Sequence, residues 1–291
     1  MKTSIKNYLS LVKFSHTIFA LPFAMVGFFL AIEAEGGQLD WRLLVLVLFC
    51  MVFARSAAMA YNRYLDRGID AKNPRSDQRE IHAGLISERA ALVFVIINCL
   101  LFIATTYFIN TLCFLLSPVA LLVTLGYSYT KRFTSLCHIV LGLGLALAPV
   151  GAYMAVTGSF GVLAVLYGLS VLFWVSGFDI IYALQDEEFD RSLNLQSIPV
   201  RLGKTNALRL SNVLHVICAI CMISASILLA QTYPSVNWLH WLATSVFIIL
   251  LFYQHRLVSP NDLSKVNLAF FTTNGIASLI FGILLILDFY L

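Results

Sequence analysis

Apolar residues follow one another in long runs that are separated by short polar segments. The runs cover about residues 17–34, 43–62, 90–109, 111–129, 136–156, 160–182, 207–230, 237–255 and 267–290. Each is close to the roughly 20 residues that a helix needs to cross a bilayer. The runs lack strand-like alternation, and backbone polar groups in lipid must be satisfied within the protein. The pattern therefore predicts an all-α polytopic membrane protein with nine transmembrane helices.

Composition supports this fold class. The chain is 60% hydrophobic and only 12% charged, whereas a soluble domain carries about 25% charged residues. The first run is too long for the apolar part of a signal peptide and no small-residue cleavage site precedes Glu33, so we expect it to remain as a helix. The basic balance, with a pI near 8.7, suits anionic lipid headgroups rather than nucleic acid.

The basic residues predict the orientation of the chain. All but two of the 19 Lys and Arg residues fall on the N-terminal side of the nine-helix arrangement; Arg42 lies opposite and Arg55 within a run. Because Lys and Arg concentrate in cytoplasmic loops, we predict a cytoplasmic N-terminus in the cell (inner) membrane. The two longest loops, about 63–89 and 183–206, then form a cytoplasmic cap on a single domain that spans residues 1–291.

Acidic residues gather where two apolar runs enter these loops. Ten of the 15 Asp and Glu residues lie in or just after two motifs, Asn62-x3-Asp66-x3-Asp70 and Asp179-x6-Asp186-x3-Asp190. Helical positions four or seven apart share a face, and like charges there repel, so we expect a cation beside each stripe. Asp179 lies within an apolar run, where an acid costs about 2.5–3.5 kcal/mol on insertion scales and usually serves a function.

The donor chemistry of the motifs indicates a ligand. Oxygen ligands select hard cations, and Mg2+ is usually held by one or two carboxylates plus substrate phosphates. Two acidic motifs therefore predict two Mg2+ ions that bridge a diphosphate. Nearby basic residues would neutralise the remaining phosphate charge; they are Arg67, Arg75, Arg79, Lys131 and Arg132. The alternative is that all these charges are ordinary solvated loop residues, but the pairing of the motifs and the depth of Asp179 favour a site.

Three segments resemble a known family. Segments 62–79 and 179–191 resemble the two signatures of the UbiA superfamily of intramembrane aromatic prenyltransferases, and Gly126–Arg132 looks like the Tyr-x3-Lys loop of that family. The signatures occur in the family's order and cover essentially the whole chain. The resemblance implies nine helices around a central cavity that opens sideways to lipid and is capped by the two cytoplasmic loops.

The resemblance also implies roles for residues. Mg2+ and the prenyl diphosphate would be held by Asn62, Asp66, Asp70, Asp186 and Asp190. The diphosphate would be contacted by Arg67, Arg75, Arg79, Lys131 and Arg132. The family's Arg-x3-Arg pattern is present in the first cap loop, but Glu80 stands where a proline usually follows it.

The implied reaction is the departure of diphosphate, the attack of an electron-rich aromatic carbon on the allylic cation, and the loss of a ring proton, in a core that excludes water. Asp179 or a phosphate oxygen is expected to be the base or to orient the acceptor. Tyr127 and Ser128 are candidates for contact with the acceptor. Arg55 either binds an acceptor carboxylate or pairs with an acid. His16, His138 and His215 are expected to be packing residues.

Two aromatic acceptors remain open. The Asp179–Asp186 stretch resembles the 4-hydroxybenzoate polyprenyltransferase branch, whereas the Lys13–Pro22 segment resembles a variant group that acts on 1,4-dihydroxy-6-naphthoate. We therefore expect a Mg2+-dependent prenyltransferase of ubiquinone or menaquinone biosynthesis that uses a polyprenyl diphosphate and a small aromatic carboxylate. The alternatives are an enzyme for another aromatic or lipid acceptor, or a secondary transporter, although a transporter would not need both motifs at the membrane surface. No obligate protein partner is indicated.

Overall fold

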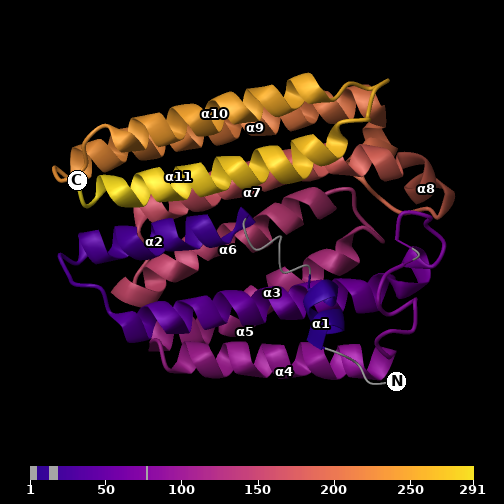
Figure 1. Ribbon diagram of the computed structural model, residues 1–291, viewed down its shortest axis with the longest axis horizontal. Coiled ribbons are helices and arrows are strands. Elements are labelled where there is room, and N and C mark those ends of the chain that lie inside the picture. Colours follow the sequence, from indigo (N-terminus) through magenta and orange to yellow (C-terminus); the bar gives the residue numbers. More distant parts are fainter. Residues whose placement is uncertain (1–4, 13–18, 77) are drawn as a thin grey trace. The chain divides into compact units, whose positions relative to one another are not determined.

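The computed structural model describes residues 5–12, 19–76 and 78–291, except for the side chains of residues 5 and 6, and its regular structure in these ranges is helical apart from one isolated β-bridge between Ser259 and Asp262 (Figure 1). The helices are α1 Ile5–Leu11, α2 Leu21–Ala34, α3 Trp41–Asp70, α4 Glu88–Tyr107, α5 Thr111–Thr130, α6 Cys137–Thr157, α7 Val162–Ala183, the 3-10 turn η2 Leu184–Asp186, α8 Glu187–Ser192, α9 Ile198–Thr232, α10 Leu239–Leu257, the π-helix η3 Leu268–Thr273 and α11 Asn274–Asp288. The all-α prediction is confirmed. His16 and most of the Lys13–Pro22 segment lie outside the described residues.

Apolar helices dominate the described chain. Seven helical segments there are long and apolar enough to cross a membrane by length and composition, and α2 is a shorter apolar helix. Each of the nine predicted runs contains a helix in the described part of the chain. The protein is an integral membrane protein; that nine helices cross the bilayer stays a prediction.

Two helix boundaries differ from the prediction. Helix α3 continues to Asp70, so the first cap loop begins at residue 71 rather than 63. Helix α9 begins at Ile198, within the segment expected to be a loop, because the Ser197 side chain caps the N–H of Val200 and Pro199 suits the first helical turn. Gly203, with φ of +74°, interrupts α9 in a conformation that favours glycine.

The chain separates into two compact units. The first holds α1, α3, α4 and α5 up to Tyr129, and the second holds α2 and the chain from Thr130 onward. In the first unit α3 packs along α4, and α1 contacts α3. A small core joins them, with Leu11 of α1, Ala60 of α3 and Val95 of α4 all buried. The single domain expected for residues 1–291 stays a prediction.

Helix α7 is the centre of the second unit. It packs against α6 and α9, while α10 pairs with α11. Helix α7 is apolar on all sides, as expected of a helix that is enclosed by other helices. Aromatic rings fill the core: Trp174 lies 5.4 Å from the Phe23 ring and 5.3 Å from that of Phe247. At Gly177, a Cβ atom would collide with the imidazole ring of His215 on α9, so the absence of a side chain lets these helices approach closely.

Asp288 joins the end of α11 to the start of α10. Its carboxylate accepts hydrogen bonds from the backbone N–H groups of Asn237, Leu239 and His240, at 3.0–3.2 Å. The Nδ1 atom of His240 lies 2.7 Å from its Oδ2. Both side chains are fully buried. One carboxylate thus satisfies N–H groups that the first turn of a helix leaves without intrahelical partners.

Candidate functional site

The first acidic motif lies on one face of α3, as predicted. Because the helix runs unbroken to Asp70, Asn62, Asp66 and Asp70 form a continuous stripe. The Asn62 amide donates to the Asp66 carboxylate at 3.2 Å. Asp66 is 2% and Asp70 4% exposed, and buried carboxylates of this kind require compensating positive charge.

Two arginines surround this stripe. Arg79, from the first cap loop, forms an ion pair with Asp70, as expected of a cation beside the motif. Arg63 is 7% exposed on α3, and Asp70, Arg79 and Glu80 all act on its charge. Arg63 was not predicted, although it lies seven residues before Asp70 and therefore on the same helical face.

Arg67 and Arg75 occupy different surroundings. The Arg67 guanidinium binds Glu88 at the start of α4 at 2.9 Å, and also donates to the Tyr64 carbonyl at 2.7 Å. The Arg67 side chain therefore pairs with α4 rather than with the acidic stripe of α3. Arg75 is exposed in the turn after α3, where its backbone N–H donates to the Asn73 side chain. The roles of Arg67 and Arg75 with diphosphate stay predictions.

Glu80, which stands in place of the expected proline, ties the first cap loop to α1. Its carboxylate accepts a hydrogen bond from the Ser10 hydroxyl, and its side chain is buried. Its backbone carbonyl accepts from the N–H groups of Leu85 and Ile86. The departure from the family pattern thus places a buried acid beside Arg63 and fixes the path of the loop.

The acceptor candidates of the first unit lie near one another. Tyr127 on α5 is close enough to interact electrostatically with both Arg55 and Arg63 on α3. The Nε atom of Arg55 is buried and has no hydrogen-bond partner among the described residues. Ser128 follows on α5 and is buried. Among the described residues no acid lies within hydrogen-bond distance of Arg55 Nε. Both roles expected for Arg55 stay predictions.

The second motif does not lie on one helix, which corrects the predicted stripe. Helix α7 ends at Ala183, residues Leu184–Asp186 tighten into a 3-10 turn, and α8 starts again at Glu187. Asp186 has φ of −102° and ψ of 3°, outside helical geometry. Four acids within residues 186–190 would repel one another on a regular helix, which favours this interruption.

The second motif nevertheless gathers the expected lysine. Lys131, Asp186 and His138 lie close enough to Asp190 to act on its charge, and the Ser197 side chain hydrogen-bonds to it. The Lys131 carbonyl accepts from the Gln196 N–H at 2.7 Å, which docks the second cap segment. Arg132 is half-buried beside Lys131 in the chain.

Asp179 is paired with a histidine that the sequence did not single out. Its Oδ2 lies 2.7 Å from Nδ1 of His138, which is 41 residues away at the start of α6. We expected His138 to be a packing residue, and it is buried, but it is also the partner of the deepest acid in the motif. No spacing or local pattern in the sequence connects the two.

The donor set suits Mg2+ by its chemistry. Among the described residues, no group of three or more His, Cys, Asp and Glu side chains lies together as a metal cage. Each motif instead offers a pair of acids, Asp66 with Asp70 and Asp186 with Asp190. One or two carboxylates completed by substrate phosphates is the usual Mg2+ arrangement, so the residues present fit such an ion.

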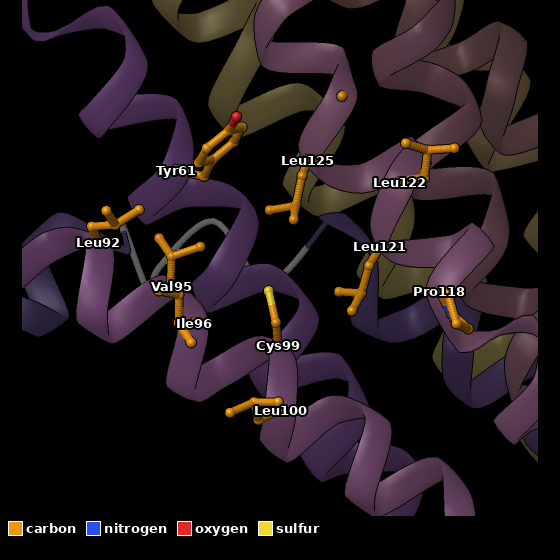
Figure 2. A pocket seen from close by; sticks show the side chains of 11 residues that line it. Tyr61, Leu92, Val95, Ile96, Cys99, Leu100, Pro118, Leu121, Leu122 and Leu125 are labelled. Carbon is orange, nitrogen blue, oxygen red and sulfur yellow. The ribbon is translucent and has the colours of Figure 1, made fainter.

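An apolar pocket of about 540 Å3 lies between α3, α4 and α5 in the first unit (Figure 2). It is lined by Tyr61, Leu92, Val95, Ile96, Cys99, Leu100, Pro118, Leu121, Leu122, Leu125 and Gly126. The lining contains no charged side chain. It includes the chain neighbours of Asn62 and Tyr127, so it begins beside two candidate site residues.

The UbiA prenyltransferase family matches residues 20–276 of this chain. The chain belongs to the UbiA prenyltransferase family. This UbiA protein is 28% identical over 280 residues to the 4-hydroxybenzoate octaprenyltransferase of Photobacterium profundum, a match that covers 96% of this chain and 95% of the relative. The resemblance inferred from the three signatures is confirmed, and the chain is a prenyltransferase rather than a secondary transporter.

Solved structures share the fold of this UbiA protein. The apo structure of a UbiA homologue from Aeropyrum pernix K1 superposes with a TM-score of 0.82 and 31% identity, over 94% of this chain and 98% of that one. A UbiA homologue from Archaeoglobus fulgidus, solved with GPP and Mg2+ bound, gives a TM-score of 0.76 and 22% identity over 98% of this chain and 100% of that one.

Proposed function

We propose that this UbiA protein transfers a polyprenyl group from a polyprenyl diphosphate to an aromatic carboxylate in respiratory quinone biosynthesis, with Mg2+ as cofactor. The observation that carries the proposal is that each acidic motif has its own cation, Arg79 beside Asp70 and Lys131 beside Asp190. A metal-bound diphosphate requires carboxylates that bind the metal and cationic side chains that bind the phosphate oxygens. The names of relatives such as 4-hydroxybenzoate octaprenyltransferase support the reaction class.

In this proposal the two acidic motifs bind the prenyl donor, the polyprenyl diphosphate. We assign Mg2+ to Asn62, Asp66, Asp70, Asp186 and Asp190. When bound, Mg2+ neutralises diphosphate charge and so supports its departure. Arg79 and Lys131, with Arg67, Arg75 and Arg132, bind phosphate oxygens in the same proposal. The active site then faces the cytoplasm under the two cap loops, and nine helices surround it.

The aromatic acceptor is bound by Arg55, Tyr127 and Ser128 in the same proposal. Arg55 Nε is buried and has no hydrogen-bond partner among the described residues, which suits it to a carboxylate, because a bidentate Arg–carboxylate pair is strong and orients a planar acid. The aromatic carbon of the acceptor attacks C1 of the prenyl group as its C–O bond to diphosphate breaks. Asp179 then takes the ring proton, and the electrons of that C–H bond restore the aromatic ring.

Either of two acceptors satisfies this site. The names of the relatives favour 4-hydroxybenzoate. The segment at residues 13–22, most of it outside the described residues, favours 1,4-dihydroxy-6-naphthoate by its resemblance to the variant group. The isoprenoid chain of the donor is assigned to the apolar pocket between α3, α4 and α5, whose lining offers it only carbon, sulfur and one tyrosine.

The test is prenyl transfer by the purified protein in detergent with a long-chain prenyl diphosphate, Mg2+ and each acceptor in parallel. We expect product from one acceptor, and its loss when the divalent cation is chelated or when Asp186 is changed to Asn. Asp262→Asn, an exposed loop acid outside both motifs, is the matched control and keeps full activity. Product with chelator present would contradict the Mg2+ assignment, and no product from either acceptor would overturn the proposed substrate class.

A further inference from the structure

Asp179 lies in surroundings that do not favour a carboxylate. Its neighbours Phe178 and Ile180 on α7 are buried, and Gly177 abuts the His215 ring. Its own side chain is 22% exposed. A polar group in such a place needs a hydrogen-bond partner, and that partner also fixes the direction of the side chain.

His138 supplies that hydrogen bond from a fixed position. Its Nδ1 lies 2.7 Å from Asp179 Oδ2, and the backbone N–H of Ile198 donates to its Nε2 at 3.4 Å. Because a backbone N–H can only donate, Nε2 is the acceptor nitrogen and the ring proton lies on Nδ1. The Ser176 hydroxyl on α7 donates to the Leu172 carbonyl at 2.6 Å and also lies 3.2 Å from the His138 carbonyl. The ring is therefore held by α6, α7 and the start of α9.

A second His–Asp pair in the same unit shows what a purely structural pair looks like. In the His240–Asp288 pair both side chains are fully buried, and three backbone N–H groups also bind the carboxylate. Asp179 differs on both counts. Within the described chain it takes a hydrogen bond only from His138, on Oδ2, and it keeps part of its surface exposed. No described residue is seen to hydrogen-bond to its Oδ1, the oxygen to which we assign the proton below.

We infer that His138 is a positioning residue that holds the Asp179 carboxylate in the orientation that removes the ring proton during prenyl transfer. The inference rests on the proposed function, in which Asp179 is the base. In the step, the ring C–H bond breaks, its electron pair returns to the ring, and the proton goes to Asp179 Oδ1. His138 keeps its Nδ1 proton throughout, because Nε2 is already engaged by Ile198, and so acts only through Asp179.

The test compares His138→Ala, His138→Asn and Asp179→Asn in the purified full-length protein, with prenyl diphosphate, Mg2+ and the acceptor that the wild type uses. Loss of an orienting partner typically costs about 10–100-fold, so we expect His138→Ala to lower kcat by that amount while KM for the donor changes less than about 3-fold. His138→Asn restores most of kcat, because its amide N–H can stand where Nδ1–H stood. Asp179→Asn should cost about 10²–10⁴-fold, the usual contribution of general acid–base catalysis.

The double variant separates positioning from general damage. If His138 acts through Asp179, then His138→Ala in the Asp179→Asn background costs less than about 3-fold more. His240→Ala is the matched control for His138→Ala, since it removes the Nδ1–H donor of the structural pair and should lower thermal stability without lowering kcat. If His138→Ala does not fold, His138→Gln takes its place, because its amide reaches towards Ile198 but not Asp179.

Several outcomes would overturn the inference. An unchanged kcat in a folded His138 variant, or single effects that multiply in the double variant, would show that His138 does not act through Asp179. Equal losses for His138→Asn and His138→Ala would show that the Nδ1–H donor is unimportant. A wild-type protein that makes no product with either acceptor would instead reject the proposed function, and this inference with it.

Discussion

Removing the Asp288 carboxylate should destabilise the second unit without changing its chemistry. In Asp288→Ala, the N–H groups of Asn237, Leu239 and His240 and the Nδ1–H of His240 lose their acceptor. Asn237 is exposed and can bind water instead, but His240 is fully buried, so its two donors stay unsatisfied. At about 1–3 kcal/mol for each stranded donor, with a smaller share from Leu239, the loss is about 3–5 kcal/mol, which agrees with the cost of breaking a buried pair.

The free energy of unfolding can be measured by titrating the protein with SDS in mixed micelles and following helicity. Asp288→Asn keeps one acceptor oxygen and should lose about 1–3 kcal/mol, while Asp262→Asn should leave the midpoint unchanged. Prenyl transfer per folded molecule should be the same in all three variants. A change below about 1 kcal/mol in Asp288→Ala would refute the reasoning, since it would mean that water or a neighbour satisfies the buried donors.

Three further predictions concern the substrates. Arg79→Ala should raise KM for the prenyl diphosphate by about 10–100-fold, on the scale of a lost charge-assisted hydrogen bond, and Arg79→Lys by less, as steady-state kinetics would show. Gly126→Leu should fill the apolar pocket and shift the preference towards shorter prenyl donors in a competition assay, whereas Gly151→Leu, also with open space at its Cβ position, should not. Arg55→Ala should raise KM for the aromatic carboxylate and leave KM for the donor within about 3-fold; an unchanged acceptor KM would remove Arg55 from the site.

Local rules predicted the first motif well. Asn62, Asp66 and Asp70 are four residues apart, so their common face depends only on the continuation of α3, and the continuation is observed. Asp70 and Arg79 form an ion pair although they are nine positions apart. Repulsion between acids four residues apart had already predicted a nearby cation. Composition and run length likewise sufficed for the all-α membrane fold.

Tertiary contacts decided what the sequence could not show. His138 and Asp179 are 41 positions apart, and no pattern in the intervening sequence reports their contact. Arg67 binds Glu88 rather than facing the motif, because the start of α4 is brought to it by helix packing. The 3-10 turn that ends at Asp186 depends on a local balance between helix continuation and charge repulsion, which motif spacing alone cannot resolve.

The contact between Gly177 and His215 has a consequence for how this enzyme can diverge. Any Cβ at position 177 would collide with the imidazole ring, and position 177 lies two residues before Asp179. A larger residue at 177 is therefore tolerated only if a smaller one replaces His215 at the same time. Among homologues, these two positions should covary, with glycine at 177 accompanying histidine at 215. The pair would then mark lineages in which α7 and α9 keep the same spacing beside Asp179.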